Sequence, residues 1–362
     1  MTRRSCIFVL LAAAAVLCEA RIDVVHKTHL PDSRPGFSRE KFIGTFDACS
    51  LFAEYTLQDG GIVRKRWGDY FFGLSLGYSP KNGGWNRWDF LRVMARTEKG
   101  LVNVLSESRP AVFFGYSANG ADFLAGEWEC AGGRRVKLRF AAFPSHRDWL
   151  FLKVDFGGVS VESVQLSAYP GNAAVPEGRE RHLATKERDW LVNAGNVDFT
   201  PASPYILLYS RFIDDRFGNK IVYDTAPVKS VFMRKSVSAL TAEFRPDAGA
   251  SEMTFSLGYF AHRHPDDQLV RFLGEDGDAI YGFMKSIDWN ALPGGDDFRM
   301  SVGIARSMGV SDKVLSPVVR RFAAARKARA VNEMYACAEE VLALRRQAVS
   351  EGLAAFSDAA AR

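Results

Sequence analysis

The chain has 362 residues, and its 47 Lys and Arg against 42 Asp and Glu give a formal net charge of +5. This length allows one large domain or two smaller ones. A small charge of mixed sign excludes a dedicated nucleic-acid-binding protein, which would carry a basic stripe. The 27 Phe, 11 Tyr and 7 Trp residues favour β-strands, where aromatic side chains are enriched.

Residues 1–20 have the pattern of a secretory signal peptide. Two arginines form a basic start, and the apolar stretch Ile7–Leu17 is too short to span a bilayer, which takes roughly 20 residues. Cys18–Ala20 then supplies a cleavage site with small residues. The alternative is a lipoprotein anchored at Cys18, which the bulky leucine before it disfavours. The sequence therefore predicts a secreted or periplasmic protein whose mature chain has no integral membrane segment.

Three cysteines, Cys49, Cys130 and Cys337, remain after removal of that peptide. An odd number allows at most one internal disulfide and leaves one thiol over. Cys49 and Cys130 would be the pair to test, because both lie in the region with strand patterns. The alternative is that all three are buried and reduced, and it is favoured because a domain of this size can build a core without disulfides.

Residues 21–45 show little periodicity and are expected to form an N-terminal arm. Over residues 46–262, roughly sixteen short apolar segments follow one another, separated by turn residues, as in an all-β sandwich or barrel. A simple immunoglobulin-like sandwich needs about seven strands. The region is therefore one large two-sheet sandwich or two ordinary ones in tandem, and the lack of a Pro/Ser-rich linker favours one domain.

From residue 263 the spacing of apolar residues becomes helical. Phe272, Ile280 and Phe283 recur at helical intervals, and a longer pattern runs from Ser311 to about Glu351, before Gly352. The predicted fold class is thus mainly β: a large two-sheet antiparallel β-sandwich over residues 46–262, followed by a C-terminal α-helical region over residues 263–362.

The most polar segment lies between two predicted strands and is expected to be a loop. Glu180 and His182 are candidate catalytic residues, because carboxylate and imidazole groups can act as general acid and base. Arg179, Arg181 and Trp190 are candidate substrate-binding residues, because guanidinium groups bind hydroxyls or anions and indole stacks on sugar rings. The alternative is a solvated surface loop with local ion pairs, which is the commoner role of charged segments.

A second cluster contains Trp85, Arg87 and Trp88, just after an Asn-Gly-Gly turn. Aromatic residues exposed at the end of a loop would form a stacking platform for a ligand, so these three are also candidate substrate-binding residues. The alternative is that the tryptophans fill the core between two sheets, where large aromatic residues are usually found.

Two further patterns are weaker. His262 and His264 have strand spacing and could share a metal, but no other His or Cys has supporting spacing, so no metal site is predicted. A basic run over residues 320–329 could attract an acidic partner, but it fits a solvated helix face. Serine-hydrolase, zinc-protease, phosphate-loop and dinucleotide motifs are all absent, and no cofactor is predicted.

The succession of aromatic-rich strands after a signal peptide resembles the large β-sandwich of galactose mutarotase-like proteins. The resemblance is one of architecture over residues 46–262, and no catalytic motif of that family is matched. It implies a protein that interacts with glycans, but no particular activity. Two hypotheses follow from the sequence. The first is a secreted carbohydrate-binding or carbohydrate-processing protein whose partner is a glycan. The second is a non-catalytic envelope or extracellular protein with a structural or interaction role, whose protein partner the sequence does not identify.

Overall fold

The structure is a computed structural model. It describes residues 22–31, 36–47, 49–63, 66–67, 70–71, 74–80, 90–168, 180–192, 196–212, 215–235, 240–260 and 270–360. The signal peptide predicted for residues 1–20 lies outside these ranges.

A five-stranded antiparallel sheet begins the described chain. Its order is β1-β2-β3-β4, with β7 pairing on β3. The strands are β1 (Asp23–Pro31), β2 (Phe37–Thr45), β3 (Cys49–Gln58), β4 (Gly61–Ile62) and β7 (Leu74–Pro80). The segment expected to be an arm therefore supplies two strands. Its strand character is weak in the sequence because the buried positions of β2 include Glu40 and Gly44 as well as Phe42.

A nine-stranded antiparallel sheet is the largest element. Its order is β10-β11-β12-β13-β22-β19-β18-β15-β16. The strands are β10 (Pro110–Ala118), β11 (Ala121–Glu129), β12 (Arg135–Ala142), β13 (Trp149–Asp155), β15 (Glu180–Ala184), β16 (Asp189–Leu191), β18 (Tyr205–Phe212), β19 (Asp215–Tyr223) and β22 (Glu252–Tyr259). Its neighbours in space, such as β13 and β22, are far apart in sequence, so the sheet depends on long-range pairing.

A six-stranded sheet has the order β17-β20-β21-β14-β8-β9. Its strands are β8 (Leu91–Thr97), β9 (Gly100–Asn103), β14 (Val161–Ala168), β17 (Val197–Phe199), β20 (Val228–Lys235) and β21 (Leu240–Pro246). Two short strands, β5 (Arg66–Trp67) and β6 (Tyr70–Phe71), pair with each other.

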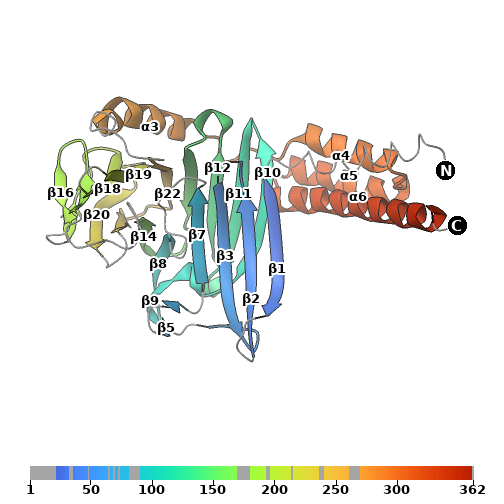
Figure 1. Ribbon diagram of the computed structural model, residues 1–362, viewed down its shortest axis with the longest axis horizontal. Helices are drawn as coiled ribbons and strands as arrows, with labels where there is room; N and C mark the ends of the chain where they lie inside the picture. Colours follow the sequence, from blue (N-terminus) through green and yellow to red (C-terminus); the bar gives the residue numbers. More distant parts are fainter. Residues whose placement is uncertain are drawn as a thin grey trace. The chain divides into compact units, whose positions relative to one another are not determined.

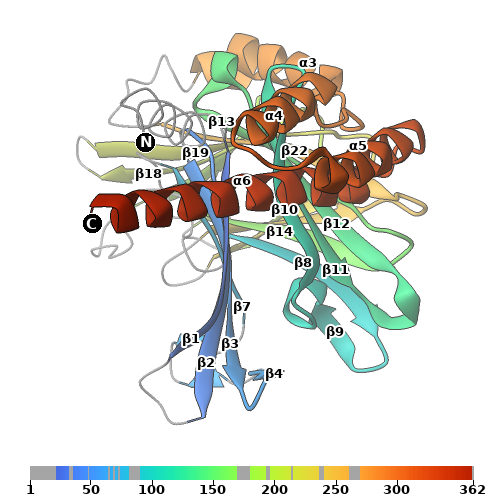
Figure 2. The ribbon, with the colours of Figure 1, turned by 90° about the vertical axis from the view of Figure 1, so that its right-hand side faces the viewer.

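The nine-stranded sheet packs against both other sheets. At one end, Phe42 of β2 lies 5.5 Å from Phe113 of β10 between ring centroids. At the other, Phe244 of β21 makes edge contacts at 5.0 Å with Tyr223 and with Phe255. Figures 1 and 2 show β1, β2, β3 and β7 side by side in one layer. The predicted β-sandwich is confirmed, with its second layer divided into two sheets.

The chain divides into two compact units. The larger spans residues 23–115 and 123–289, and it includes the π-helical turn η5 (Phe272–Asp276) and helix α3 (Gly277–Ser286). The smaller takes in residues 116–122 and the helices from residue 290 onward. Those helices are α4 (Gly295–Ser307), α5 (Asp312–Lys327) and α6 (Val331–Ala360).

Helices α4, α5 and α6 share an apolar core that includes Phe298, Phe322 and Val341. The single helical pattern expected from Ser311 is interrupted after α5, where Arg329 has a positive φ of 54°. Helix α6 then continues through Gly352, where the sequence placed an end. Glycine lowers the helix propensity at position 352, but it does not by itself end a helix when the residues on both sides of it favour helical structure.

The three cysteines predicted to survive processing all lie among the described residues, and no disulfide joins any two of them. Cys49 and Cys337 are buried, and Cys130 is only partly so. Burial is the first cause that raises the pKa of the Cys130 and Cys337 thiols. Among the described helices, none combines the length and the apolarity needed to cross a membrane.

Candidate functional site

The charged segment expected to be a loop is in fact a β-hairpin, formed by β15 and β16. Thr185 closes its turn: its backbone N–H donates to the Arg188 carbonyl at 2.8 Å, and its Oγ1 accepts from the backbone N–H groups of Glu187 and Arg188, both at 3.3 Å. The expectation failed because strand β15 buries two charged or polar residues, Arg181 and His182. Such residues are rare inside strands, so the composition of the segment was typical of a loop.

His182, Asp189 and Tyr209 meet on one face of this hairpin and of the next strand. The Nδ1 atom of His182 lies 3.0 Å from Oδ1 of Asp189, and the Tyr209 hydroxyl donates to Oδ2 of the same carboxylate at 2.5 Å. The rings of His182 and Tyr209 are stacked, with centroids 4.7 Å apart. The Asp189 side chain is 43 % exposed, whereas His182 and Tyr209 are buried.

This arrangement fixes the chemistry of the imidazole. An ionised carboxylate only accepts hydrogen bonds, so Nδ1 of His182 must be the donor and the basic nitrogen is Nε2. A carboxylate that holds a histidine in this way orients the ring and stabilises its protonated form. The three side chains therefore form a group able to take up and return a proton.

Arg181 and Trp190 lie on the opposite face of the same hairpin. Trp190 pairs with Leu183, whose side chain points away from that of His182 because successive strand residues alternate. Trp190 stacks on Phe199 at 5.0 Å, with the Arg188 guanidinium 5.2 Å above the indole ring. The structure thus separates Arg181 and Trp190 from His182, although the sequence placed them in one site.

The remaining candidate residues are not described in full. Glu180 begins β15 and its backbone pairs with Arg211, but its side chain lies outside the described part of the chain. Trp85, Arg87, Trp88 and Arg179 lie outside the described residues altogether. Their roles stay predictions.

Tyr209 was not identified from the sequence, since it sits in the apolar strand β18 and reads as core. Its partner Asp189 belonged to the charged segment but was not singled out. A signal did exist, because Asp189 follows a tight turn that returns the chain to His182. The placement of Tyr209 against them needed the pairing of β15 with β18.

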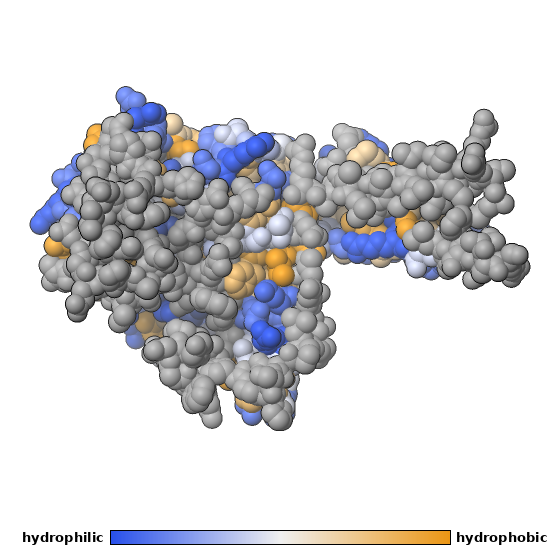
Figure 3. Space-filling model, in the orientation of Figure 1, coloured by the Kyte–Doolittle hydropathy of each residue, from blue (hydrophilic) through white to orange (hydrophobic). Residues whose placement is uncertain are grey.

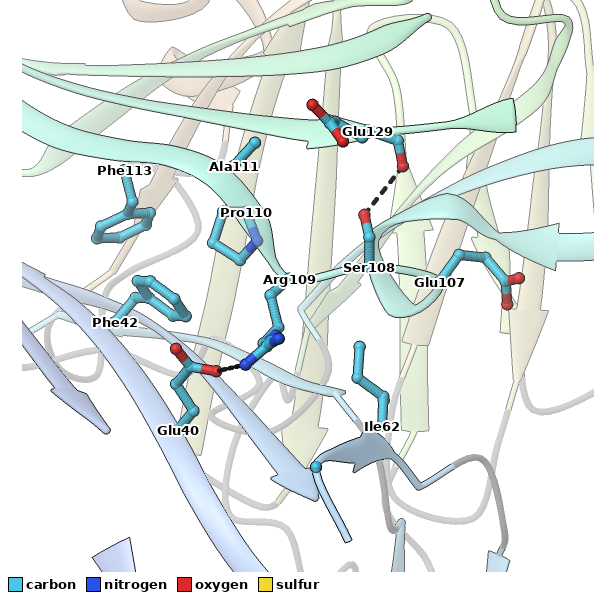
Figure 4. Close-up of a pocket in the computed structure, with 11 residues that line it drawn as sticks. Glu40, Phe42, Ile62, Glu107, Ser108, Arg109, Pro110, Ala111, Phe113 and Glu129 are labelled. Atoms are coloured by element: carbon cyan, nitrogen blue, oxygen red, sulfur yellow. Dashed lines mark hydrogen bonds and ion pairs between the residues drawn. The ribbon is translucent and has the colours of Figure 1, made fainter. Parts of the chain in front are cut away.

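A groove with a volume of about 690 Å³ lies between the five-stranded and nine-stranded sheets. Figure 4 shows Arg109 reaching Glu40 inside it, with an N–O distance of 2.8 Å. Glu40 is nearly buried, and the Ser108 hydroxyl donates to the Glu129 carbonyl at 2.9 Å. Nothing in the sequence indicated this groove, because its walls come from strands far apart in the chain.

The groove combines charged and apolar surfaces. Phe42 and Phe113 add apolar rings to its lining, and Glu107 and Arg109 add charged groups. A concave site with apolar walls and a few polar groups is the usual form of a small-molecule site. On the side of the molecule seen in Figure 3, described hydrophilic residues in blue and hydrophobic residues in orange lie side by side.

The weaker predictions have simpler outcomes. Among the described residues, no three His, Cys, Asp or Glu side chains are grouped so as to hold a metal ion. The pair His262 and His264 lies outside those residues. In the basic run, Arg321 is bound to Glu333 at 2.8 Å and to Glu340 at 2.9 Å, as on an ordinary helix face.

Protein-family models give no match to the sequence, and a search of curated proteins gives none either. Among solved structures, the matches described next have TM-scores below 0.5. A candidate aldose 1-epimerase from Klebsiella pneumoniae has a TM-score of 0.37 and 8 % identity, covering 72 % of this chain and 96 % of that one. At this TM-score the resemblance is one of fold only and assigns no property to this chain.

Two larger proteins are also similar. Heparinase III has a TM-score of 0.30 at 10 % identity over 69 % of this chain, and a heparan sulfate lyase from Pedobacter heparinus has 0.24 at 10 % over 64 %. The chain spans about a third of the length of each, 36 % in both cases. At these TM-scores and identities the similarities transfer neither a fold nor a residue role to this chain.

Proposed function

We propose that this protein binds carbohydrate and acts on it by proton transfer through His182. The observation that carries the proposal is the Asp189 carboxylate, which joins the imidazole of His182 to the phenol of Tyr209. A neutral imidazole with a fixed tautomer is a general base near neutral pH, and its protonated form is a general acid. Sugar hydroxyls and ring oxygens are groups on which such proton transfer acts.

The expected contribution of His182 to the reaction rate is large enough to be measured by comparing variants. A positioned acid or base contributes about 10²- to 10⁴-fold to a reaction rate. The purified protein should be incubated with a panel of neutral and uronate-containing oligosaccharides, and products should be separated by mass and by stereochemistry. His182→Asn removes the proton-carrying group while keeping a polar side chain of similar size.

His146→Asn is the matched control. His146 stacks on Phe283 at 3.9 Å and hydrogen-bonds to Ser145 at 2.9 Å, and no carboxylate of the described residues is bound to it. Turnover that is lost in His182→Asn and kept in His146→Asn supports the proposal. Equal turnover in wild type and His182→Asn contradicts it.

A second candidate function is glycan binding without turnover, and the groove at Arg109 favours it. Aromatic rings beside carboxylate and guanidinium groups are the usual composition of a sugar-binding surface. Isothermal titration with the same panel should show binding that Arg109→Ala weakens by tenfold or more. Arg96→Ala is the control, because Arg96 is also paired with a carboxylate, Glu162 at 2.9 Å, but lies away from the groove.

We also propose that the protein is exported. Its first 20 residues carry the features of a cleavable signal, and the proposal predicts a mature chain that starts at Arg21. Cell fractionation followed by N-terminal sequencing tests it. A cytosolic protein that retains Met1 would contradict export.

A further inference from the structure

Lys220 lies on the same sheet face as the stacked pair His182–Tyr209. In the register of β18 and β19, Tyr209 pairs with Gly218, and Leu207 pairs with Lys220. Gly218 and Lys220 are two residues apart on one strand, so they share a face. On the other side Lys220 pairs with Gly258 of β22, which in turn pairs with Trp149 of β13.

Three aromatic rings surround the Lys220 amine. Its Nζ atom lies 4.5 Å from the ring centre of Phe260, 4.9 Å from that of Trp149 and 5.8 Å from that of Phe272. These rings come from three different places in the chain: the end of β22, the start of β13 and the turn η5. The amine is thus flanked by aromatic carbon on these sides, while Lys220 as a whole stays partly exposed.

Two glycines make room for this cage. A Cβ atom on Gly258 would come within 2.9 Å of the Trp149 indole, and one on Gly218 within 2.9 Å of the Phe260 ring. Each glycine lets one aromatic ring lie flat on the sheet beside Lys220. The aromatic cage therefore depends on these two glycines, because any side chain at either position would take the space of a ring.

Charge does little to offset this enclosure. Within the described part of the chain, the side-chain amine of Lys220 has no hydrogen bond and no ion pair. Asp148 and Asp276 are near enough to raise the pKa of the amine, but Asp276 is already held by Arg271 at 3.0 Å. Burial is the larger effect and lowers the pKa of Lys220 from 10.5 to about 8.

We propose that Lys220 is a nucleophilic amine that forms an imine with a small aldehyde. The neutral amine attacks the carbonyl carbon, and a C–N bond forms as the carbonyl oxygen becomes a hydroxyl. The carbinolamine then loses that hydroxyl as water together with the second hydrogen of the amine. The products are one C=N bond and one water, and the step needs no oxidant or reductant.

The surroundings of Lys220 favour imine formation by its neutral amine over a structural role for its ammonium group. The aromatic faces attract an ammonium group, but burial removes its hydration, and the loss of hydration is the larger of the two effects on Lys220. A lysine placed among apolar groups is one of the recognised forms of an activated amine nucleophile. The aldehyde class follows from the amine itself and does not depend on the proposed action of His182 on sugars.

Reductive trapping tests the proposal. The full-length mature protein is incubated at pH 7 with glyceraldehyde and cyanoborohydride, which converts an imine into a stable secondary amine, and the modified lysines are mapped by peptide mass spectrometry. Lys285 is the internal control, since its ammonium is bound to Asp224 at 2.6 Å and its pKa is raised. Lys220 has a larger neutral fraction but is intrinsically a weaker nucleophile, and we expect it to be labelled about tenfold faster than Lys285.

Two variants separate this reactivity from other causes. Gly258→Ala displaces the Trp149 ring, which should rehydrate the amine and bring Lys220 labelling towards the Lys285 rate. Lys285→Met should leave Lys220 labelling unchanged. Labelling of Lys220 at or below the rate of Lys285 in the folded wild-type protein would overturn the proposal, whatever the sugar assays with His182→Asn show.

Discussion

The Trp128 indole donates a hydrogen bond of 2.7 Å to the hydroxyl of Tyr55, linking β11 to β3. Tyr55 in turn donates to the Leu105 carbonyl at 3.2 Å. Both aromatic side chains are almost completely buried, and burial raises the pKa of Tyr55 above its ordinary range. The hydroxyl of Tyr55 therefore stays protonated, and its hydrogen bond with Trp128 joins the five-stranded sheet to the nine-stranded sheet.

Tyr55→Phe should lower the free energy of unfolding by about 1–3 kcal/mol, because it leaves a buried donor and a buried acceptor unpaired. Urea unfolding followed by circular dichroism measures the change. The double variant with Trp128→Phe should cost less than the sum of the two single changes, because the first change already breaks the bond. Strict additivity in this cycle would show that the hydrogen bond does not couple the sheets.

Asp189→Asn should impair proton transfer by His182 while the fold is kept. An asparagine cannot hold the imidazole and the phenol as a carboxylate does, so we expect turnover of the responsive glycan to fall about 100-fold or more. Nitrogen NMR of the imidazole should show the loss of the Nδ1–H tautomer as the dominant form. Asp198→Asn, at an exposed aspartate paired with Arg245 at 3.3 Å, should leave both measurements unchanged.

Gly258→Ala and Gly282→Ala should have opposite effects on stability. The added methyl group at Gly258 meets the Trp149 indole and should destabilise the fold by about 1–3 kcal/mol. Gly282 is inside α3 with open space around it, so alanine there should stabilise the helix by up to about 1 kcal/mol. Thermal unfolding of both variants checks the pair. Equal destabilisation would contradict the close approach of Trp149.

The partly buried Lys220 should make stability depend on pH. Between about pH 8 and 10.5 the unfolded chain keeps a proton on this lysine that the folded protein has lost, so stability should rise with pH in that window. Below about pH 8 both states are protonated and the cost of burying the charge is fully felt. Lys220→Met removes this term.

The difference in unfolding free energy between wild type and Lys220→Met should therefore change with pH. Wild type should gain on the variant by roughly 1 kcal/mol per pH unit from about pH 8 to 9.5. Comparison with the variant cancels the titration of other groups, including buried tyrosines whose raised pKa values lower stability at still higher pH. A difference independent of pH from 7 to 9.5 would contradict a lowered pKa for Lys220.

The class of fold could be predicted because it depends on local periodicity. Val136, Leu138 and Phe140 alternate with basic residues and are buried in β12, as a half-buried strand requires. The C-terminal apolar residues recur at helical spacing and form the core of α4, α5 and α6. Arg181 and His182 could not be placed in a strand in this way, because their burial depends on partners elsewhere in the chain.

By itself, then, the sequence determined a β-sandwich with C-terminal helices and identified His182 as a residue of interest. Only the tertiary structure decided that His182 meets Asp189 and Tyr209 while Arg181 and Trp190 face the other way. The groove at Arg109 and the aromatic cage of Lys220 are likewise formed only in the tertiary structure. The physical reason is that alternation is a property of a few consecutive residues, whereas a site depends on strand register, which is set by pairing between segments far apart in the chain.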